Sequence, residues 1–236
     1  MEFQCKEFEL NHSHSTMKIG TDAILLSALL PIFKPSNALD IGTGCGIVAL
    51  CMAQIYKQTE IVAIDIDKES IQEASINFAN SKFHKRLTAK HISLQNFTQK
   101  TLEKFDLIVA NPPFFIDSLL SNNEKRNISR HNVTLTLQDL VLSVEKLLSP
   151  NGYFVVILPH NEMKKLFIAE TQNLFLIKQH FIFDKDNKPC RRIISQFGKQ
   201  KMDCDTSIGH IIIRNRDNTY TETYKNLTSP FLLYKR

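Results

Sequence analysis

The stretch NPPFF, residues 111 to 115, places two prolines and two aromatic rings directly after an apolar run, FDLIVA. The side-chain oxygen of Asn111 and the carbonyl of Pro112 are neighbouring neutral acceptors, and Pro112 and Pro113 stiffen the backbone that carries them. Two such acceptors can hold both N–H groups of an amine on a planar ring, so that its lone pair faces an electrophile. Phe114 offers a flat apolar face for a base lifted out of its stack. The stretch therefore predicts a clamp for a ring amine, with a loop that merely ends a strand as the alternative.

A second group of residues with chemical potential lies in LDIGTGCG, residues 39 to 46. It holds three of the seven glycines of the chain, Gly42, Gly44 and Gly46. Glycine permits a tight turn and lets a ligand approach the backbone closely. Asp40 precedes the glycines, and Asp65 ends the next apolar run, EIVAIDI, where a carboxylate can accept hydrogen bonds from ribose hydroxyls. We expect a ribose-containing ligand here, with a purely structural turn as the alternative.

The spacing of the glycines distinguishes between two cofactors. A nicotinamide cofactor is bound by G-x-G-x-x-G, but counting from Gly42 the last position of that frame is Ile47. The pattern present, D-x-G-x-G-x-G, resembles the S-adenosyl-L-methionine loop of class I methyltransferases. This resemblance implies that the loop backbone and Asp40 contact the amino acid end of the cofactor. It also implies that Asp65 contacts the ribose and that Asn111 lies beside the cofactor.

Alternating strands and helices are needed to position these residues. The apolar patterns predict strands at 38–41, 60–66, 87–92, 105–110 and 153–158, and helices at 21–30, 47–56, 68–82, 137–148 and 161–172. Thr136 and Asp139 predict a capping box at the start of the fourth helix, and Pro150, Asn151 and Gly152 predict a stop after it. Two extended stretches, 174–183 and 191–197, predict a closing hairpin. The alternation indicates an α/β protein with a parallel sheet, whose ligands bind at the carboxyl ends of the strands.

Several longer segments resemble one family. MKIGTDAILL (17–26), LDIGTGCG, NPPFF, ISRHN (128–132) and KPCRRIISQF (188–197) occur in the order found in the bacterial tRNA1(Val) adenine-N6 methyltransferases. These enzymes modify the adenine immediately 3′ of the anticodon. The resemblance covers most of the chain. It implies a Rossmann-like class I methyltransferase fold with a mostly parallel seven-stranded sheet and a C-terminal antiparallel hairpin. It also implies S-adenosyl-L-methionine as the methyl donor and tRNA as the partner.

The sequence departs from this resemblance at the end of the third predicted strand. Many relatives carry an acid near the cofactor adenine there, whereas this chain has KHISLQNF, and Ser93 takes that place. A serine hydroxyl can still form a hydrogen bond to the cofactor. The resemblance also places Asp22, at the start of the first helix, near the cofactor pocket.

The basic residues are unevenly distributed. The chain has a net charge of +5, but residues 1–150 hold 15 Lys and Arg against 16 Asp and Glu, and residues 151–236 hold 14 against 8. An excess of positive charge in the last third favours a polyanion such as RNA, with ordinary solvated surface as the alternative. The candidate phosphate contacts form two groups, Arg126, Arg130 and His131 after the clamp, and Lys188, Arg191 and Arg192 near the hairpin.

The composition bears on several other classes. The chain has no run of about 18 apolar residues, so no membrane span is predicted. MEFQCKEFEL lacks the apolar region of a signal peptide. Five cysteines without a C-x-x-C pair favour a reduced, cytoplasmic protein. His12 and His14 form an H-x-H pair without clustered ligands, so no metal is expected. We expect one methyltransferase domain over 1–236, with a helix-containing extension at 1–36 and basic strands at 174–236, as a monomer.

Three alternatives share some of these features. An amino-methyltransferase acting on ribosomal RNA or DNA could use the same clamp. A protein-glutamine methyltransferase usually has Tyr after the two prolines and a separate N-terminal helical domain, whereas here about 37 residues precede the first strand. A non-catalytic RNA-binding protein would not need both Asn111 and an intact glycine loop.

Overall fold

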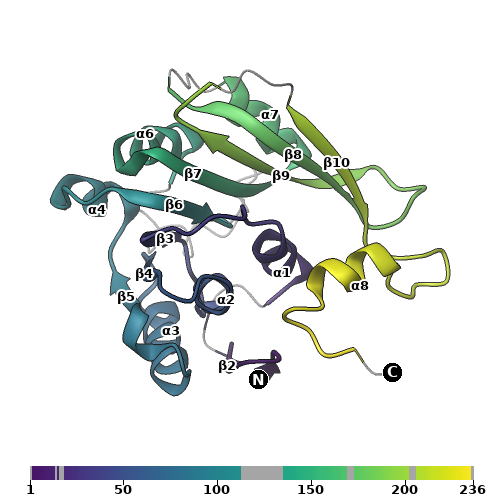
Figure 1. Ribbon diagram of the computed structural model, residues 1–236, viewed down its shortest axis with the longest axis horizontal. Coiled ribbons are helices and arrows are strands. Elements are labelled where there is room, and N and C mark those ends of the chain that lie inside the picture. Colours follow the sequence, from purple (N-terminus) through teal and green to yellow (C-terminus); the bar gives the residue numbers. More distant parts are fainter. Residues whose placement is uncertain are drawn as a thin grey trace, which may run out of the picture.

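Four strands form the parallel half of the sheet. They are β3 (Asn37–Ile41), β4 (Glu60–Asp65), β5 (Leu87–His91) and β6 (Phe105–Ala110). The computed structural model describes residues 2–13, 15, 19–112, 135–168, 173–201 and 206–234. In this part of the chain the sheet has eight strands, in the order β10-β8-β9-β7-β6-β3-β4-β5 (Figure 1). β3 lies between β4 and β6, so the chain reverses its winding direction there, which is where open α/β sheets bind ligands.

The other half of the sheet is mixed. β7 (Leu148–Pro159) runs parallel to β6, and β9 (Cys190–Gly198) runs antiparallel to both β7 and β8 (Phe175–Phe183). β10 (Ser207–Ile212) then pairs in parallel with β8 at the outer edge. The hairpin β8–β9 therefore enters the sheet with its second strand next to β7.

Helices cover both faces of the sheet (Figure 1). α1 (Thr21–Ala28), α2 (Ile47–Ile55), α3 (Lys68–Asn80) and α8 (Glu222–Thr228) share one cluster of buried apolar side chains. α4 (Leu94–Lys100), α6 (Leu137–Leu147) and α7 (His160–Ile168) share a second cluster on the opposite face. A 3-10 turn (His84–Arg86) precedes β5. Burial on both faces explains why the central strands are almost entirely apolar.

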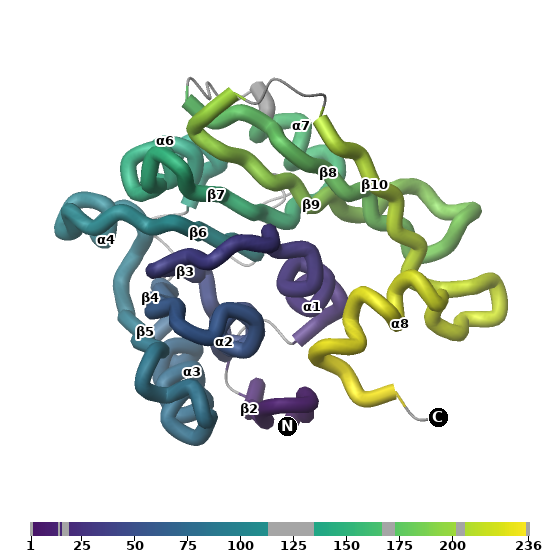
Figure 2. Tube along the Cα trace, viewed as in Figure 1, coloured from purple at the N-terminus to yellow at the C-terminus, as the bar shows by residue number. Residues whose placement is uncertain are grey.

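A short antiparallel hairpin, β1 (Glu2–Gln4) and β2 (Glu9–Asn11), lies outside the main sheet. It contacts the segment that follows α8, because the amide of Lys6 donates to the carbonyl of Phe231 at 2.8 Å. Gln54 of α2 donates to the carbonyl of Pro230 at 2.7 Å, which fixes the same segment. Figure 2 shows the N-terminal hairpin and the segment after α8 on the same side of the molecule.

The α/β architecture, the hairpin and the capping box formed by Thr136 and Asp139 are confirmed. The expectation of seven strands is corrected to eight, because Ser207–Ile212 adds an edge strand. The fourth predicted helix ends at Leu147, before residues 150–152 as expected, but the strand expected at 153–158 begins earlier, because β7 starts at Leu148 and continues through these residues. No helix in the described ranges has the length and apolar character that crossing a membrane requires.

Candidate cofactor and substrate site

The register of the parallel strands brings the predicted site residues to one edge of the sheet. Ile41 pairs with Ile64 on one side and with Ala110 on the other, so the residues after all three lie together. Asp65 and Asn111 follow Ile64 and Ala110 directly. The glycine loop, the acid of β4 and the beginning of the clamp therefore share the carboxyl edge of the sheet, as predicted.

The glycine loop has a conformation that few other residues adopt. Gly42, Gly44 and Gly46 have φ values of +70°, +55° and +91°. The amides of Gly42 and Thr43 both donate to the carbonyl of Ile64, at 2.9 and 3.1 Å, which anchors the loop to β4. A Cβ atom placed on Gly42 or Gly44 would meet nothing within 4 Å, so the space beside this backbone is open. A Cβ on Gly46 would lie 2.4 Å from the ring of Phe78, so this glycine allows α3 to pack against the loop.

Asp40 stabilises the glycine loop through buried hydrogen bonds. It is 1% exposed, and its Oδ2 accepts hydrogen bonds from the Thr43 hydroxyl at 2.7 Å and the Ala49 amide at 3.1 Å. Burial raises the pKa of Asp40 to about 7, although both hydrogen bonds oppose the rise. Asp40 thus joins the loop to the first turn of α2. Its predicted contact with the cofactor stays a prediction.

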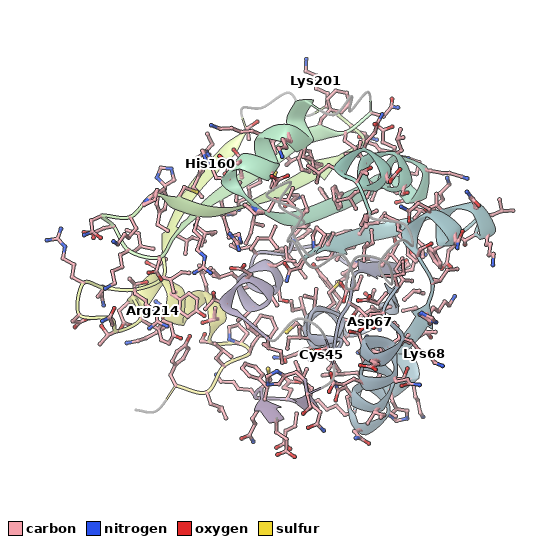
Figure 3. All side chains as sticks on the ribbon, turned by 180° about the vertical axis from the view of Figure 1, so that it is seen from behind. Cys45, Asp67, Lys68, His160, Lys201 and Arg214 are labelled. Atoms are coloured by element: carbon pink, nitrogen blue, oxygen red, sulfur yellow. The ribbon has the colours of Figure 1, made fainter. Side chains whose placement is uncertain are left out.

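Asp65 contacts the loop and the start of the next helix. Its Oδ2 accepts from the Gly44 amide at 2.9 Å, and its Oδ1 accepts from the Asp67 amide at 2.9 Å. Burial raises the pKa of Asp65, and the hydrogen bonds from Asp67 and Gly44 limit the rise. In Figure 3, Cys45 of the loop and Asp67 lie close together, consistent with these two bonds. The carboxylate is partly exposed at the site, where a ribose would need it.

Asn111 has a free acceptor at the carboxyl edge. Its side chain is partly exposed, but its Oδ1 atom is buried and has no hydrogen-bond partner among the described residues. A buried oxygen without a partner is costly unless a ligand donates to it. Pro112, the second predicted acceptor, is buried. Pro113 and Phe114 of the predicted clamp lie outside the described residues.

Ser93 has a structural role in addition to any contact with a cofactor. It is the N-cap of α4, and its Oγ accepts from the Asn96 amide at 3.3 Å. It follows His91 by two residues, and His91 pairs with Asp65, so Ser93 lies beside the same edge. Its O–H group can still donate elsewhere, and the cofactor contact stays a prediction.

The basic residues near the hairpin lie at the same edge. Arg192 pairs with Pro159, the last residue of β7, and the turn that contains Lys188 follows β8. Lys188 and Arg191 are exposed. Arg192 is less accessible, because its Nε donates to Oδ2 of Asp22 at 3.0 Å in an ion pair. Arg126, Arg130 and His131 lie outside the described residues.

The described residues contain no group of three His, Cys, Asp or Glu side chains able to hold a metal ion. His12 is 6% exposed, and its Nδ1 atom is buried without a hydrogen-bond partner in the part of the chain that the structure describes. His14 lies outside this part. Cys5, Cys45, Cys51 and Cys190 carry free thiols.

Sequence reasoning missed two residues of this region, Glu73 and Asn77 of α3. They are 5% and 2% exposed, and they bind the N-terminal segment 11–15 next to the glycine loop. The available signal was a pair of polar residues, spaced by one helical turn, on the helix face that the apolar pattern assigned to the core.

The fold, the glycine loop and the relatives of the chain define a class I methyltransferase, dependent on S-adenosyl-L-methionine. The residues present fit this cofactor: open space lies beside Gly42 and Gly44, the carboxylate of Asp65 ends β4, and Oδ1 of Asn111 is free. The chain belongs to the methyltransferase small domain family, whose model matches residues 10–181.

Curated relatives match nearly the whole chain. A tRNA1(Val) (adenine(37)-N6)-methyltransferase of Flavobacterium psychrophilum is 34% identical over 98% of this chain and 99% of its own. The enzyme of the same name from Bacteroides fragilis is 36% identical over 98% of this chain and 97% of its own.

Solved structures resemble this one in fold. An Agrobacterium tumefaciens protein, described as a predicted O-methyltransferase, has a TM-score of 0.70 at 14% identity, covering 89% of this chain and 96% of its own. A 16S rRNA methyltransferase of Thermus thermophilus, solved with AdoMet and guanosine, has a TM-score of 0.57 at 19% identity, covering 85% and 50%.

Proposed function

We propose that this protein transfers a methyl group from S-adenosyl-L-methionine to N6 of an adenine in tRNA, the adenine at position 37 of tRNA1(Val). The observation that carries the proposal is the free, buried Oδ1 of Asn111 at the same sheet edge as the glycine loop. The curated relatives that cover nearly the whole chain are named for this reaction, which supports the choice of substrate.

The chemistry asks little of the protein beyond positioning. When bound, S-adenosyl-L-methionine supplies a methyl group made electrophilic by its sulfonium. The adenine N6 lone pair is delocalised into the ring, so no side-chain base near neutral pH can activate it by deprotonation in advance. Oδ1 of Asn111 and the carbonyl of Pro112 accept hydrogen bonds from the two N–H groups and draw them out of the ring plane, so that the nitrogen becomes pyramidal and its lone pair is localised toward the methyl group. With the cofactor bound, its methyl group would be transferred to N6, the neutral thioether S-adenosylhomocysteine would leave, and the extra proton on N6 would pass to solvent.

The other residues divide between holding the cofactor and holding the RNA. The amino acid part of the cofactor lies in the open space beside Gly42 and Gly44, and the Asp65 carboxylate binds the ribose. Lys188 and Arg191, both exposed at the carboxyl edge, contact phosphates of the anticodon arm. Arg126, Arg130, His131 and the ring of Phe114 complete the RNA site in the same proposal. The chain acts as one domain and as a monomer in the cytoplasm, where its free thiols remain reduced.

A methylation assay with several nucleic acids tests the proposal. The protein is incubated with methyl-labelled S-adenosyl-L-methionine and one of four nucleic acids. These are an unmodified tRNA1(Val) transcript, ribosomal RNA, DNA, and a variant transcript in which guanine replaces the target adenine. The products are digested to nucleosides and identified by mass spectrometry. We expect N6-methyladenosine from the first transcript alone.

Label in ribosomal RNA or DNA would show that the proposed substrate is wrong, and it would leave the proposed amine clamp unchanged. Absence of label in every nucleic acid, with normal cofactor binding, would overturn the proposal and point to a protein amide or to RNA binding without catalysis. Asn111→Ala serves as the inactive control, and Asn37→Ala as an active one, because Asn37 lies at the opposite, amino edge of the sheet.

A further inference from the structure

The N-terminal segment is held against α3 by two buried polar side chains. The amide of Asn11 donates to Oδ1 of Asn77 at 2.9 Å, and Nδ2 of Asn77 donates back to the Asn11 carbonyl at 2.8 Å. Four residues along α3, the two carboxylate oxygens of Glu73 accept from the amides of Ser13 and Ser15, at 2.7 and 2.9 Å. Asn11, Ser13 and Ser15, which belong to the described part of segment 11–15, are therefore fixed through their backbone at positions that the helix determines.

The same side chains reach the glycine loop. Nδ2 of Asn77 also donates to the carbonyl of Cys45 at 2.8 Å, so a single amide group joins the loop to Asn11. Burial raises the pKa of the Cys45 thiol to about 11; the charge of Glu73 adds to the rise and a hydrogen bond with the Ser15 side chain opposes it. The carboxylate of Glu73 and the side chain of Ser15 thus both lie next to Cys45, which is the loop residue between Gly44 and Gly46.

Attaching segment 11–15 through buried polar side chains costs free energy. Glu73 is only 5% exposed, and burying a carboxylate costs free energy that its hydrogen bonds must offset. An apolar side chain would attach the segment by packing alone. Directional bonds from a buried carboxylate and a buried amide instead select one backbone position relative to the loop.

We propose that Glu73 and Asn77 are positioning residues for the cofactor, and that they hold segment 11–15 beside the glycine loop as one wall of the cofactor site. The inference rests on the proposed function only in its choice of cofactor. Cofactor binding and the docking of this segment are then coupled, and the coupling is reciprocal: the cofactor protects the segment, and the docked segment strengthens the binding of the cofactor.

Binding and hydrogen exchange test this coupling without turnover. Glu73→Gln and Asn77→Ala are compared with the unmodified protein by calorimetric titration of S-adenosylhomocysteine. We expect Kd to rise roughly tenfold or more in each variant, the effect of losing one or two well-placed hydrogen bonds. In the unmodified protein the ligand should slow amide exchange in residues 11–15, and in both variants this protection should disappear.

Asn37→Ala is a matched control. Asn37 also joins two backbone segments, because its Nδ2 donates to the Lys104 carbonyl at 2.7 Å and its Oδ1 accepts from the Asp106 amide at 3.0 Å. It lies at the amino edge of the sheet, so its loss should lower stability while leaving Kd unchanged. Glu73→Gln keeps size and shape, and it serves alone if Asn77→Ala does not fold.

The outcomes separate the two levels of the argument. Variants that fold and bind within twofold of the unmodified protein, or that retain ligand-dependent protection of residues 11–15, would overturn the inference and leave the proposed function intact. An unmodified protein that binds no S-adenosylhomocysteine or S-adenosyl-L-methionine would overturn the proposed function, and with it this inference.

Discussion

Asp22 and Arg192 form an ion pair, with 3.0 Å between Oδ2 of Asp22 and Nε of Arg192, across 170 residues of sequence. The pair joins the first turn of α1 to the start of β9, and its side chains are only 23% and 19% exposed. It therefore links the helix that follows the N-terminal segment to the hairpin that carries the basic residues. At least part of the role of Arg192 is therefore to stabilise the fold.

A double-mutant cycle measures the strength of this link. Asp22→Ala and Arg192→Ala should each lower the free energy of unfolding by about 1 kcal/mol, with a coupling of about 0.5–1 kcal/mol because the pair is partly shielded from water. Urea unfolding of both single variants and the double variant gives the coupling. Strict additivity would show that the two side chains do not stabilise one another.

The exposed basic residues should act on RNA instead of on the fold. Lys188→Glu and Arg191→Glu should weaken tRNA binding and reduce the slope of log Kd against log salt by roughly one unit for each phosphate that is no longer neutralised. Lys201→Glu is the control, because it makes the same charge change beyond the other end of β9. Equal salt slopes in all three variants would remove Lys188 and Arg191 from the RNA site.

Two glycines of the loop should respond differently to the same substitution. Gly46→Ala should destabilise the protein by about 2 kcal/mol or more, since φ is +91° and the new Cβ would lie 2.4 Å from Phe78. Gly44→Ala meets no neighbouring atom and should cost about 1 kcal/mol, but it should weaken cofactor binding by filling the open space. Thermal unfolding and calorimetric titration check the pair, and the reverse ranking of stabilities would contradict the packing argument.

The buried Asp40 predicts a pH dependence of stability. Its pKa is about 7 in the folded protein against an ordinary value of 3.8, so between these values the folded state binds more protons than the unfolded chain. The free energy of unfolding contributed by Asp40 should therefore fall as the pH rises through this window, by about 1 kcal/mol per pH unit. Asp40→Asn cannot release a proton and should lack this contribution.

Urea unfolding of both proteins at several values between pH 4 and 8 gives the contribution of Asp40, including its electrostatic coupling to Asp65. A constant difference in stability between the two proteins over that range would show that Asp40 ionises normally.

The clamp predicts a separation of binding from turnover. Asn111→Ala should leave S-adenosylhomocysteine binding within a few-fold of normal, and should lower single-turnover methylation by about a hundredfold or more, as loss of a preorganised acceptor does. Comparing the rate at saturating cofactor and tRNA with the binding constant separates the two effects. A variant with near-normal turnover would refute the role of Asn111 as an acceptor.

The parts of the fold set by local patterns were predictable. The strands Phe105–Ala110 and Glu60–Asp65 are mostly apolar, and the glycines follow such a run while Asp65 ends one, so parallel pairing alone brings them to one edge. The same logic placed Asn111 beside them. The capping box at Thr136 needs only its own four residues.

Features that depend on tertiary contacts were not predictable. The edge strand Ser207–Ile212 is short and contains Gly209, a weak strand former, and pairing with β8 stabilises it. The roles of Glu73 and Asn77 depend on where the N-terminal segment returns, which no helical pattern encodes. Arg192 is an arginine in a basic segment, which is typical of an RNA contact. Only its position opposite Asp22 shows that it pairs within the protein.

The hydrogen bond from Lys6 to the carbonyl of Phe231 imposes an order on biosynthesis. A polypeptide leaves the ribosome from its N-terminus, so residues 2–11 emerge long before Phe231, which is 1% exposed in the folded protein, and cannot complete their contacts until it has followed. The nascent chain can build the central strands and the glycine loop well before that point. The hairpin formed by the earliest residues is therefore among the last parts to be secured.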